Sequence, residues 1–289
     1  MKDPYRIVLG IDLGRDYLRA AEVEHRDEAF FVSRICDRKI SGIGVDELVR
    51  ELSAFVNEEG ILSRVASVAL DTTLFERDTI TVDSDLNQEE ISNLLKSEIS
   101  FHHNFQEVDY RPAYQVLRST DEGHNEIFYA AIDKGILVAV KDACTRCGLA
   151  LQFVDLDHSC TEVAIIKLAQ QMKNFIVVTV KEGQVEGSFC SEGQRTYYKY
   201  TYYSGEPFYF ITKMAQDLES LADKYAEKFI VSGHKADSFM IDLLKKSSDS
   251  RFELFSLGEK ILLSPLVASN EDMAASPHHF ASVIGAALK

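Results

Sequence analysis

The segment from Ile7 to Gly14 constrains the fold of this chain more than any other stretch. Ile7 to Leu13 is apolar except for Gly10 and Asp12, a pattern typical of a strand buried on both faces. A second β-rich segment, Tyr17 to Glu24, follows after the turn Gly14-Arg15-Asp16. We therefore expect a β-hairpin whose turn brings a carboxylate and a glycine together.

The order of elements around this hairpin occurs twice. The first half continues with a strand at Phe30 to Ile35, a helix closed by Gly60 and a buried strand at Val65 to Leu70. The second half contains an apolar strand, a hairpin through two glycines, an amphipathic helix and a short strand (Phe175 to Val180, Gly183 and Gly187, Ile211 to Tyr225, Phe229 to Val231). This loose internal duplication predicts two lobes.

The stretch between the two halves has an order of its own. It predicts strands and helices alternating as β-α-β-β-α-β, the split-βαβ plan (strands Phe75 to Val82, Val108 to Leu117, Glu126 to Ile132 and Leu149 to Leu156). Asn87 and Glu90 have the spacing of a capping box at the start of its first helix. We therefore predict a first lobe at 1–74, an inserted subdomain at 75–156 and a second lobe at 157–289.

Composition limits the classes of partner. The chain has 289 residues and a formal net charge of −15, which repels nucleic acid and anionic membrane surfaces. No apolar run approaches the roughly 20 residues needed to cross a bilayer, and the first residues contain no secretory apolar region. The five scattered cysteines favour reduced thiols. We expect a cytoplasmic protein without nucleic acid or direct membrane insertion.

Four segments in this order resemble the actin-like ATPase superfamily, and within it the PilM branch of type IV pilus assembly proteins, which is FtsA-related. They are the turn Asp12-Leu13-Gly14, the helix around Glu98 within Glu89 to Phe105, Cys147-Gly148-Leu149 followed by Val154-Asp155, and the closing helix Ala281 to Leu288. The resemblance spans nearly the whole chain. It implies an α/β, two-lobed, actin-like (ribonuclease H-like) fold with the inserted β-α-β-β-α-β subdomain.

The resemblance also implies ATP and Mg²⁺ as cofactors. Glycine in the first turn lets backbone N–H groups approach phosphate, and Asp12 holds a hydrated magnesium ion. The family's adenosine turn corresponds to Ser232-Gly233 here. The candidate nucleotide-binding residues are Asp12, Gly14, Arg15, Lys181, Ser232 and Gly233, with Asp12 as the metal ligand.

The same motifs depart from the family's pattern, which argues against turnover. The second hairpin should carry another Asp-x-Gly, but Thr179 and Lys181 stand at those positions; Lys181 could still neutralise a phosphate. Arg15 and Asp16 follow Gly14 where small hydroxyl residues are usual, and His234 follows Ser232-Gly233 where a glycine is usual. These changes predict a pseudo-ATPase in which nucleotide binding is weak or absent.

Other conspicuous residues have simpler explanations. Cys144 and Cys147 lie on an apolar helical stripe, which favours packing over a metal or redox pair. The neighbouring pairs His102-His103 and His278-His279 cannot each chelate one ion on a helix. A strand end followed by a helix cap explains Asp155, Asp157 and His158 better than acid–base chemistry does. The tyrosine-rich run 197–203 is equally consistent with an interface and with packing.

Three functions remain open at this point. The first is a cytoplasmic scaffold that binds the cytoplasmic tail of an inner-membrane pilus or secretion protein. The resemblance implies that this tail lies between the first lobe and the inserted module. Self-association of the scaffold stays open. The second is an active ATPase that uses Asp12 and a further carboxylate. The third is a small-molecule kinase with Asp155 as its catalytic aspartate. Fold alone does not choose among them.

Overall fold

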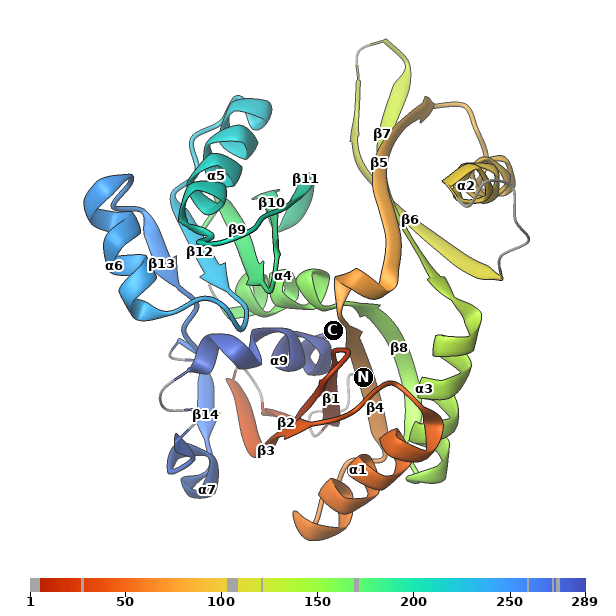
Figure 1. Cartoon of the computed structure of the whole chain (residues 1–289), viewed down its shortest axis with the longest axis vertical. Helices are drawn as coiled ribbons and strands as arrows, with labels where there is room; N and C mark the ends of the chain where they lie inside the picture. The colour runs from red at the N-terminus through yellow and green to blue at the C-terminus, as the bar shows by residue number, and fades with distance from the viewer. Residues whose placement is uncertain are drawn as a thin grey trace. The chain divides into compact units, whose positions relative to one another are not determined.

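Sheet pairing divides the chain into two units, which we describe separately from a computed structural model (Figure 1). The larger unit contains residues 1–71 and 141–289, and the smaller unit contains residues 72–140. The structure describes residues 6–26, 29–102, 109–120, 122–168, 172–258, 260–271, 273 and 276–289.

The first sheet of the larger unit has six strands with β1 near its centre. Its order is β14 (Ile261–Leu263), β3 (Ala29–Lys39), β2 (Tyr17–Arg26), β1 (Ile7–Leu13), β4 (Val65–Leu70) and β8 (Ala150–Leu156). β1 pairs antiparallel with β2 and parallel with β4. Apart from Ile7, every residue of β1 is buried, as its apolar run predicts. The expected hairpin is therefore confirmed.

The second sheet of the larger unit has five strands. Its order is β11 (Gln194–Tyr202), β10 (Gln184–Ser191), β9 (Asn174–Lys181), β12 (Lys228–Ser232) and β13 (Phe252–Leu254). One face packs on α5 (Phe208–Ala222) and α6 (Ser238–Ser247), and the other packs on α4 (Asp157–Leu168). Because strand side chains alternate, Ile176 and Val178 face α5 and α6, while Val177 faces α4. The same alternation places Thr179 and Lys181 on the α4 side.

Two helices connect the sheets at their inner faces. α9 (Ala281–Leu288), which follows η2 (Pro277–Phe280), packs on β1 and β2, and it also lies against α4. The approach is close on both sides, because a Cβ on Gly10 of β1 would overlap the carbonyl of Val283, and a Cβ on Gly285 would overlap the carbonyl of Cys160. Asp12 shares the α9 face of β1 with Gly10, which brings its carboxylate to the start of α9.

The remaining elements of the larger unit are helical. They are α1 (Val45–Glu58), α7 (Pro265–Ala268) and the end of α3 (Lys134–Arg146), which begins in the smaller unit. Ser264 caps α7 as its hydroxyl accepts a hydrogen bond from the amide of Val267. The side chain of Ser276, which directly precedes η2, makes no cap bond, and α9 begins only after this 3₁₀ turn.

The smaller unit is a three-stranded antiparallel sheet with one helix packed on it. The strand order is β5 (Phe75–Asp83), β7 (His124–Asp133) and β6 (Tyr110–Ser119), preceded by η1 (Thr72–Leu74). Ile91, Leu95 and Ile99 of α2 (Gln88–His102) pack against β7. The capping box is confirmed, because the Asn87 side chain accepts from the amide of Glu90 and the Glu90 carboxylate accepts from the amide of Asn87. Residues 103–105 of the predicted family helix and its loop lie outside the described residues.

The predicted β-α-β-β-α-β order is confirmed, but its last strand belongs to a different sheet. β8 pairs parallel with β4 of the larger unit, with Val154 opposite Val68. A parallel partner needs a crossover connection, and α3 provides the return to the first sheet. The three-stranded sheet therefore excludes β8.

Across the residues described above, no helix is long and apolar enough to cross a membrane.

Candidate functional site

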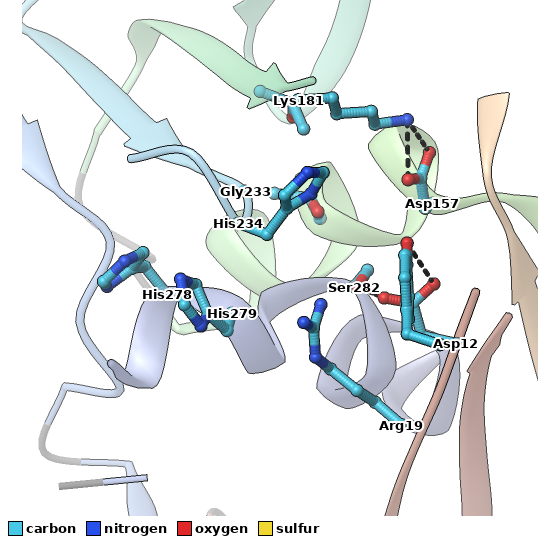
Figure 2. Close-up of a pocket in the computed structure, with 12 residues that line it drawn as sticks. Asp12, Arg19, Asp157, Lys181, Gly233, His234, His278, His279 and Ser282 are labelled. Atoms are coloured by element: carbon cyan, nitrogen blue, oxygen red, sulfur yellow. Dashed lines mark hydrogen bonds and ion pairs between the residues drawn. The ribbon is translucent and has the colours of Figure 1, made fainter. Parts of the chain in front are cut away.

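A small cavity lies where the ends of β1 and β9 meet the starts of α4 and α9 (Figure 2). Its volume is about 20 Å³, which is room for about one water molecule. Its lining is mostly polar and comes from both sheets and both inner helices (Asp12, Tyr17, Arg19, Asp157, Thr161, Thr179, Lys181, Gly233, His234, His278, His279 and Ser282).

Asp12 is the carboxylate at the first-sheet side of this cavity. Its side chain is buried and accepts a hydrogen bond from the Ser282 hydroxyl at 2.5 Å, while the Tyr17 hydroxyl lies 3.5 Å from its other oxygen. Burial, together with the nearby charge of Asp157, raises the pKa of Asp12 to about 7, although Arg19 opposes the shift. Burial thus favours the protonated form of this carboxyl more than in an exposed aspartate.

Lys181 is the cation at the second-sheet side. Its ammonium lies 2.6 Å from Asp157 Oδ2, 2.8 Å from Glu186 Oε1 and 3.5 Å from Asp71 Oδ1. All four side chains are buried. Burial alone would lower the pKa of Lys181, but the charges of Asp157, Asp71 and Glu186 raise it well above its ordinary value. We call this arrangement the Lys181 cage.

The glycine of the first turn is covered by an aromatic ring. A Cβ added to Gly14 would overlap the ring of Tyr17, so the ring lies directly against the backbone that the glycine leaves open. The guanidinium of Arg19 stacks 4.5 Å from the centre of the same ring and binds Asp37 at 2.8 Å. A ligand reaching the Gly14 backbone from this side would have to displace the ring.

A second buried polar network lies beside the cage. Thr179 Oγ1 is 2.8 Å from His158 Nδ1, and His158 Nε2 is 3.0 Å from Ser188 Oγ. Glu162 binds the guanidinium of Arg195 through both carboxylate oxygens. Burial would raise the pKa of Glu162, but Arg195 and His158 hold it down at about 2. The threonine that replaces the family's second aspartate thus belongs to an internal network.

The Ser232-Gly233 turn closes the cavity from the second sheet. Gly233 has a φ of +99°, and a Cβ there would overlap the carbonyl of Val180, so only glycine fits. The His234 ring then stands against Tyr17, with 6.3 Å between ring centres. Figure 2 shows His278 and His279, which lie in η2 just before α9, and their rings meet edge to face with 4.5 Å between the ring centres. Burial and the positive charges nearby lower the pKa of His279 to about 4.

The structure brings together some of the residues predicted from the motifs. Asp12, Lys181 and Gly233 line the cavity, and Ser232 lies behind it with its hydroxyl 3.4 Å from Thr179. Gly14 lies beneath the Tyr17 ring, whereas Arg15 is exposed and does not line the cavity.

The sequence interpretation missed the residues that surround Lys181. Asp157 was interpreted only as a helix cap, and Asp71 and Glu186 were not considered. Asp71 directly follows the buried strand β4, and Asp157 directly follows β8. These two parallel neighbours end at one edge of the sheet, so the signal for Asp71 and Asp157 was present.

The other candidates lie apart from the cavity. Asp155 forms an ion pair with Lys289. Cys144 is a buried free thiol whose pKa burial raises to about 12, and Cys147 contacts Ser53 of α1, as expected for packing. Among the described residues, no group of three or more His, Cys, Asp or Glu side chains could hold a metal ion. His103 of the first histidine pair lies outside that set.

The tyrosine run combines packing and exposure. Tyr197 and Tyr203 pack against the core that α5 and α6 cover, and Tyr198 is buried on the opposite face, where its hydroxyl donates to Glu186 at 2.8 Å. Tyr202 is exposed at the end of β11. The run thus supplies part of the wall around the Lys181 cage.

Comparison with known proteins identifies the fold. No protein-family model and no curated protein matches the sequence. Solved structures do match: a Bacteroides thetaiotaomicron protein described as having an actin-like ATPase fold and unknown function covers 93% of this chain and 94% of its own at 14% identity, with a TM-score of 0.51. Together with the two sheets and the inner helices, this places the chain in the actin-like ATPase fold.

One particular similarity is stronger. A chain of the PilM-PilN type IV pilus biogenesis complex matches with a TM-score of 0.74 over 97% of both chains, at 15% identity. The ethanolamine utilization protein EutJ from Carboxydothermus hydrogenoformans matches with a TM-score of 0.50, at 11% identity and over 100% of this chain and 90% of its own. The actin-like, PilM-like fold expected from the sequence is thus confirmed.

Proposed function

We propose that this chain is a non-catalytic scaffold in a type IV pilus or related inner-membrane assembly, where it binds the cytoplasmic tail of a membrane protein. The observation that carries the non-catalytic part is the Lys181 cage: a cation of the chain itself is bound by three carboxylates at the place expected for the second phosphate turn. Support for the assembly comes from the match to a chain of the PilM-PilN complex over nearly the full length.

ATP and Mg²⁺ do not fit the residues that surround the cavity. Pockets for ligands of this kind measure roughly 300 Å³ or more, against about 20 Å³ here. Lys181 already pairs with Asp157, the predicted metal ligand Asp12 accepts from Ser282, and the Tyr17 ring covers Gly14. Opening the site would separate a buried lysine from its partners, which costs several kcal/mol. We infer that the site is structural.

Calorimetry tests the non-catalytic part. ATP with Mg²⁺, titrated into the full chain at millimolar concentration, should give no saturable heat. The matched comparison is Asp12→Ala against Arg15→Ala, since Asp12 lines the cavity and Arg15 is exposed. Tight binding to the wild type that Asp12→Ala abolishes and Arg15→Ala preserves would make the chain an active nucleotide binder instead.

Affinity purification tests the scaffold part. Tagged full-length protein expressed in its own cells, and recovered from detergent-solubilised membranes, should bring with it a protein with a single membrane span and a short cytoplasmic segment. A synthetic peptide of that segment should then bind the purified chain. Recovery of no such membrane protein would refute the scaffold assignment and leave the nucleotide result unaffected. Because Asp155 is paired with Lys289, no observation favours the kinase alternative.

A further inference from the structure

A groove with a volume of about 520 Å³ opens at the N-terminal ends of α5 and α6, and it is separate from the cavity described above. Its apolar lining comes from Tyr203, Pro207, Phe208, Phe239, Met240 and Leu243. It shares no lining residue with the cavity around Lys181. The groove and the cavity therefore use different side chains, although the Tyr203 hydroxyl donates a hydrogen bond to the backbone carbonyl of Lys181 at 2.7 Å.

The helix α6 has two apolar faces, and only one of them packs into the core. Met240, Ile241 and Leu244 pack into the core beneath the helix. Phe239 and Leu243 are one helical turn apart on another side, where they remain 71% and 41% exposed. A phenylalanine and a leucine adjoining an open groove form an apolar surface of the type that binds partners.

The rim of the groove is acidic. Glu182, Glu206 and Asp237 line it, together with the single cation Lys235. Lys235 forms an ion pair with Glu182, and Asp237 caps α6 by accepting from the amide of Met240 at 2.6 Å. In the described part of the chain, Glu206 pairs with no basic side chain. The four side chains carry a net charge of about −2, which favours a cationic occupant.

We propose that this groove binds a short basic peptide segment of another protein, with one aromatic or aliphatic side chain inserted between Phe208 and Leu243 and with flanking Lys or Arg residues near Glu206. Charge argues against a second copy of this chain, since both copies carry −15, and against anionic lipid or nucleic acid. The proposal does not depend on whether the partner belongs to a pilus or secretion assembly.

Selection from a random 12-residue peptide library displayed on phage tests the proposal. The full chain is the target, and the double variant Phe239→Glu/Leu243→Glu is used to remove peptides that bind elsewhere. Enriched peptides should share an aromatic or aliphatic residue flanked by Lys or Arg. A synthetic copy of one such peptide, labelled for fluorescence anisotropy, should bind the wild-type chain with an affinity that falls as salt rises.

Single substitutions then locate the binding site. Phe239→Ala and Leu243→Ala should each weaken the selected peptide about tenfold or more, as expected for anchor contacts. Glu206→Lys should also lower the affinity for the selected peptide, and this loss should be larger at low salt than at high salt. The matched control is Leu221→Ala, an exposed leucine of α5 outside the groove, which should leave the affinity unchanged.

Three outcomes would overturn the proposal. The first is a selection that yields no peptide able to distinguish the wild type from the double variant, and the second is enrichment of acidic or uncharged sequences. The third is a wild-type dimer, seen by analytical ultracentrifugation, that Phe239→Glu converts to monomers, because a second copy would then cover the groove. All the substituted side chains are exposed, and circular dichroism should show unchanged helix content.

Discussion

The carbonyl oxygen of Cys160 faces Gly285 so closely that any side chain at position 285 would overlap it. Cys160 belongs to α4, which packs on the second sheet, and Gly285 belongs to α9, which packs on the first. The two helices therefore touch backbone to backbone at the centre of the larger unit. This contact fixes how closely the two sheets approach each other.

Gly285→Ala should destabilise the protein by about 1–3 kcal/mol, the usual cost of overpacking. The sign of this stability change is informative, because replacing glycine by alanine inside a helix otherwise stabilises a protein by up to about 1 kcal/mol. Urea unfolding followed by circular dichroism measures the change. Gly42→Ala is the control, since a Cβ at Gly42 meets nothing within 4 Å. Equal stability of the two variants would show that α4 and α9 can move apart freely.

Lys181→Met should destabilise the protein by about 3–5 kcal/mol, because it leaves buried carboxylates without their cation. Adding Asp157→Asn and Glu186→Gln to Lys181→Met should recover much of the loss by removing two of those charges. Chemical unfolding of the three proteins measures both steps.

Lys235→Met provides the matched control, since its ion pair with Glu182 is exposed to solvent and should contribute little to stability. If Lys181→Met is no more costly than Lys235→Met, the carboxylates around Lys181 are neutral and the cage is not ionic.

Asp12→Asn should change the pH dependence of stability. The pKa of Asp12 is about 7 in the folded chain and 3.8 ordinarily, so between these values the folded state binds more protons and wild-type stability falls as pH rises. Asparagine removes this dependence. The stability of the variant relative to wild type should therefore improve from pH 4 to pH 8, by up to about 4 kcal/mol.

Free energies of unfolding at pH 4, 6 and 8 test this expectation. Asp46→Asn serves as the control because the Asp46 side chain is almost fully exposed and lies outside the cavity. If the stability difference between Asp12→Asn and the wild type does not change with pH, then Asp12 is ionised at all three pH values. The favourable charge of Arg19 would in that case outweigh the effect of burial on the pKa of Asp12.

His279→Asn should reduce the loss of stability in mild acid. The pKa of His279 is lowered from 6.5 to about 4, so between these values the unfolded state binds more protons and wild-type stability falls as pH falls. The variant should lose less stability from pH 6.5 to pH 4.5 in thermal unfolding. His124→Asn, which changes a partly exposed histidine of the smaller unit, is the comparison variant.

Local elements of this fold could be predicted from the sequence, because their signals lie within a few residues. The opening hairpin, the capping box at Asn87 and the order of strands around it are of this kind. The sheet that β8 joins depends on pairing with β4, some 85 residues earlier in the chain, and no local pattern encodes that choice. The lobe boundaries at 74/75 and 156/157 stay a prediction.

The candidate site shows the same division. Asp12, Lys181 and Gly233 could be found because each stands at a motif position. The complete cage around Lys181 could not, because only Asp71 and Asp157 follow neighbouring parallel strands, whereas Glu186 lies on β10 of the other sheet and stands at no motif position. Lysine at a glycine position therefore suggested a lost site, whereas the structure shows that the position has gained three ionic partners.

A lysine differs from a bound metal ion or nucleotide in one respect that bears on regulation. Its amount always equals that of the protein, so the Lys181 cage stays filled whatever the cellular supply of ATP or magnesium. A clamp held by a soluble ligand would open as that ligand is depleted, since its stabilisation follows ligand concentration. The ionic contacts around Lys181 therefore do not depend on the concentration of a soluble ligand.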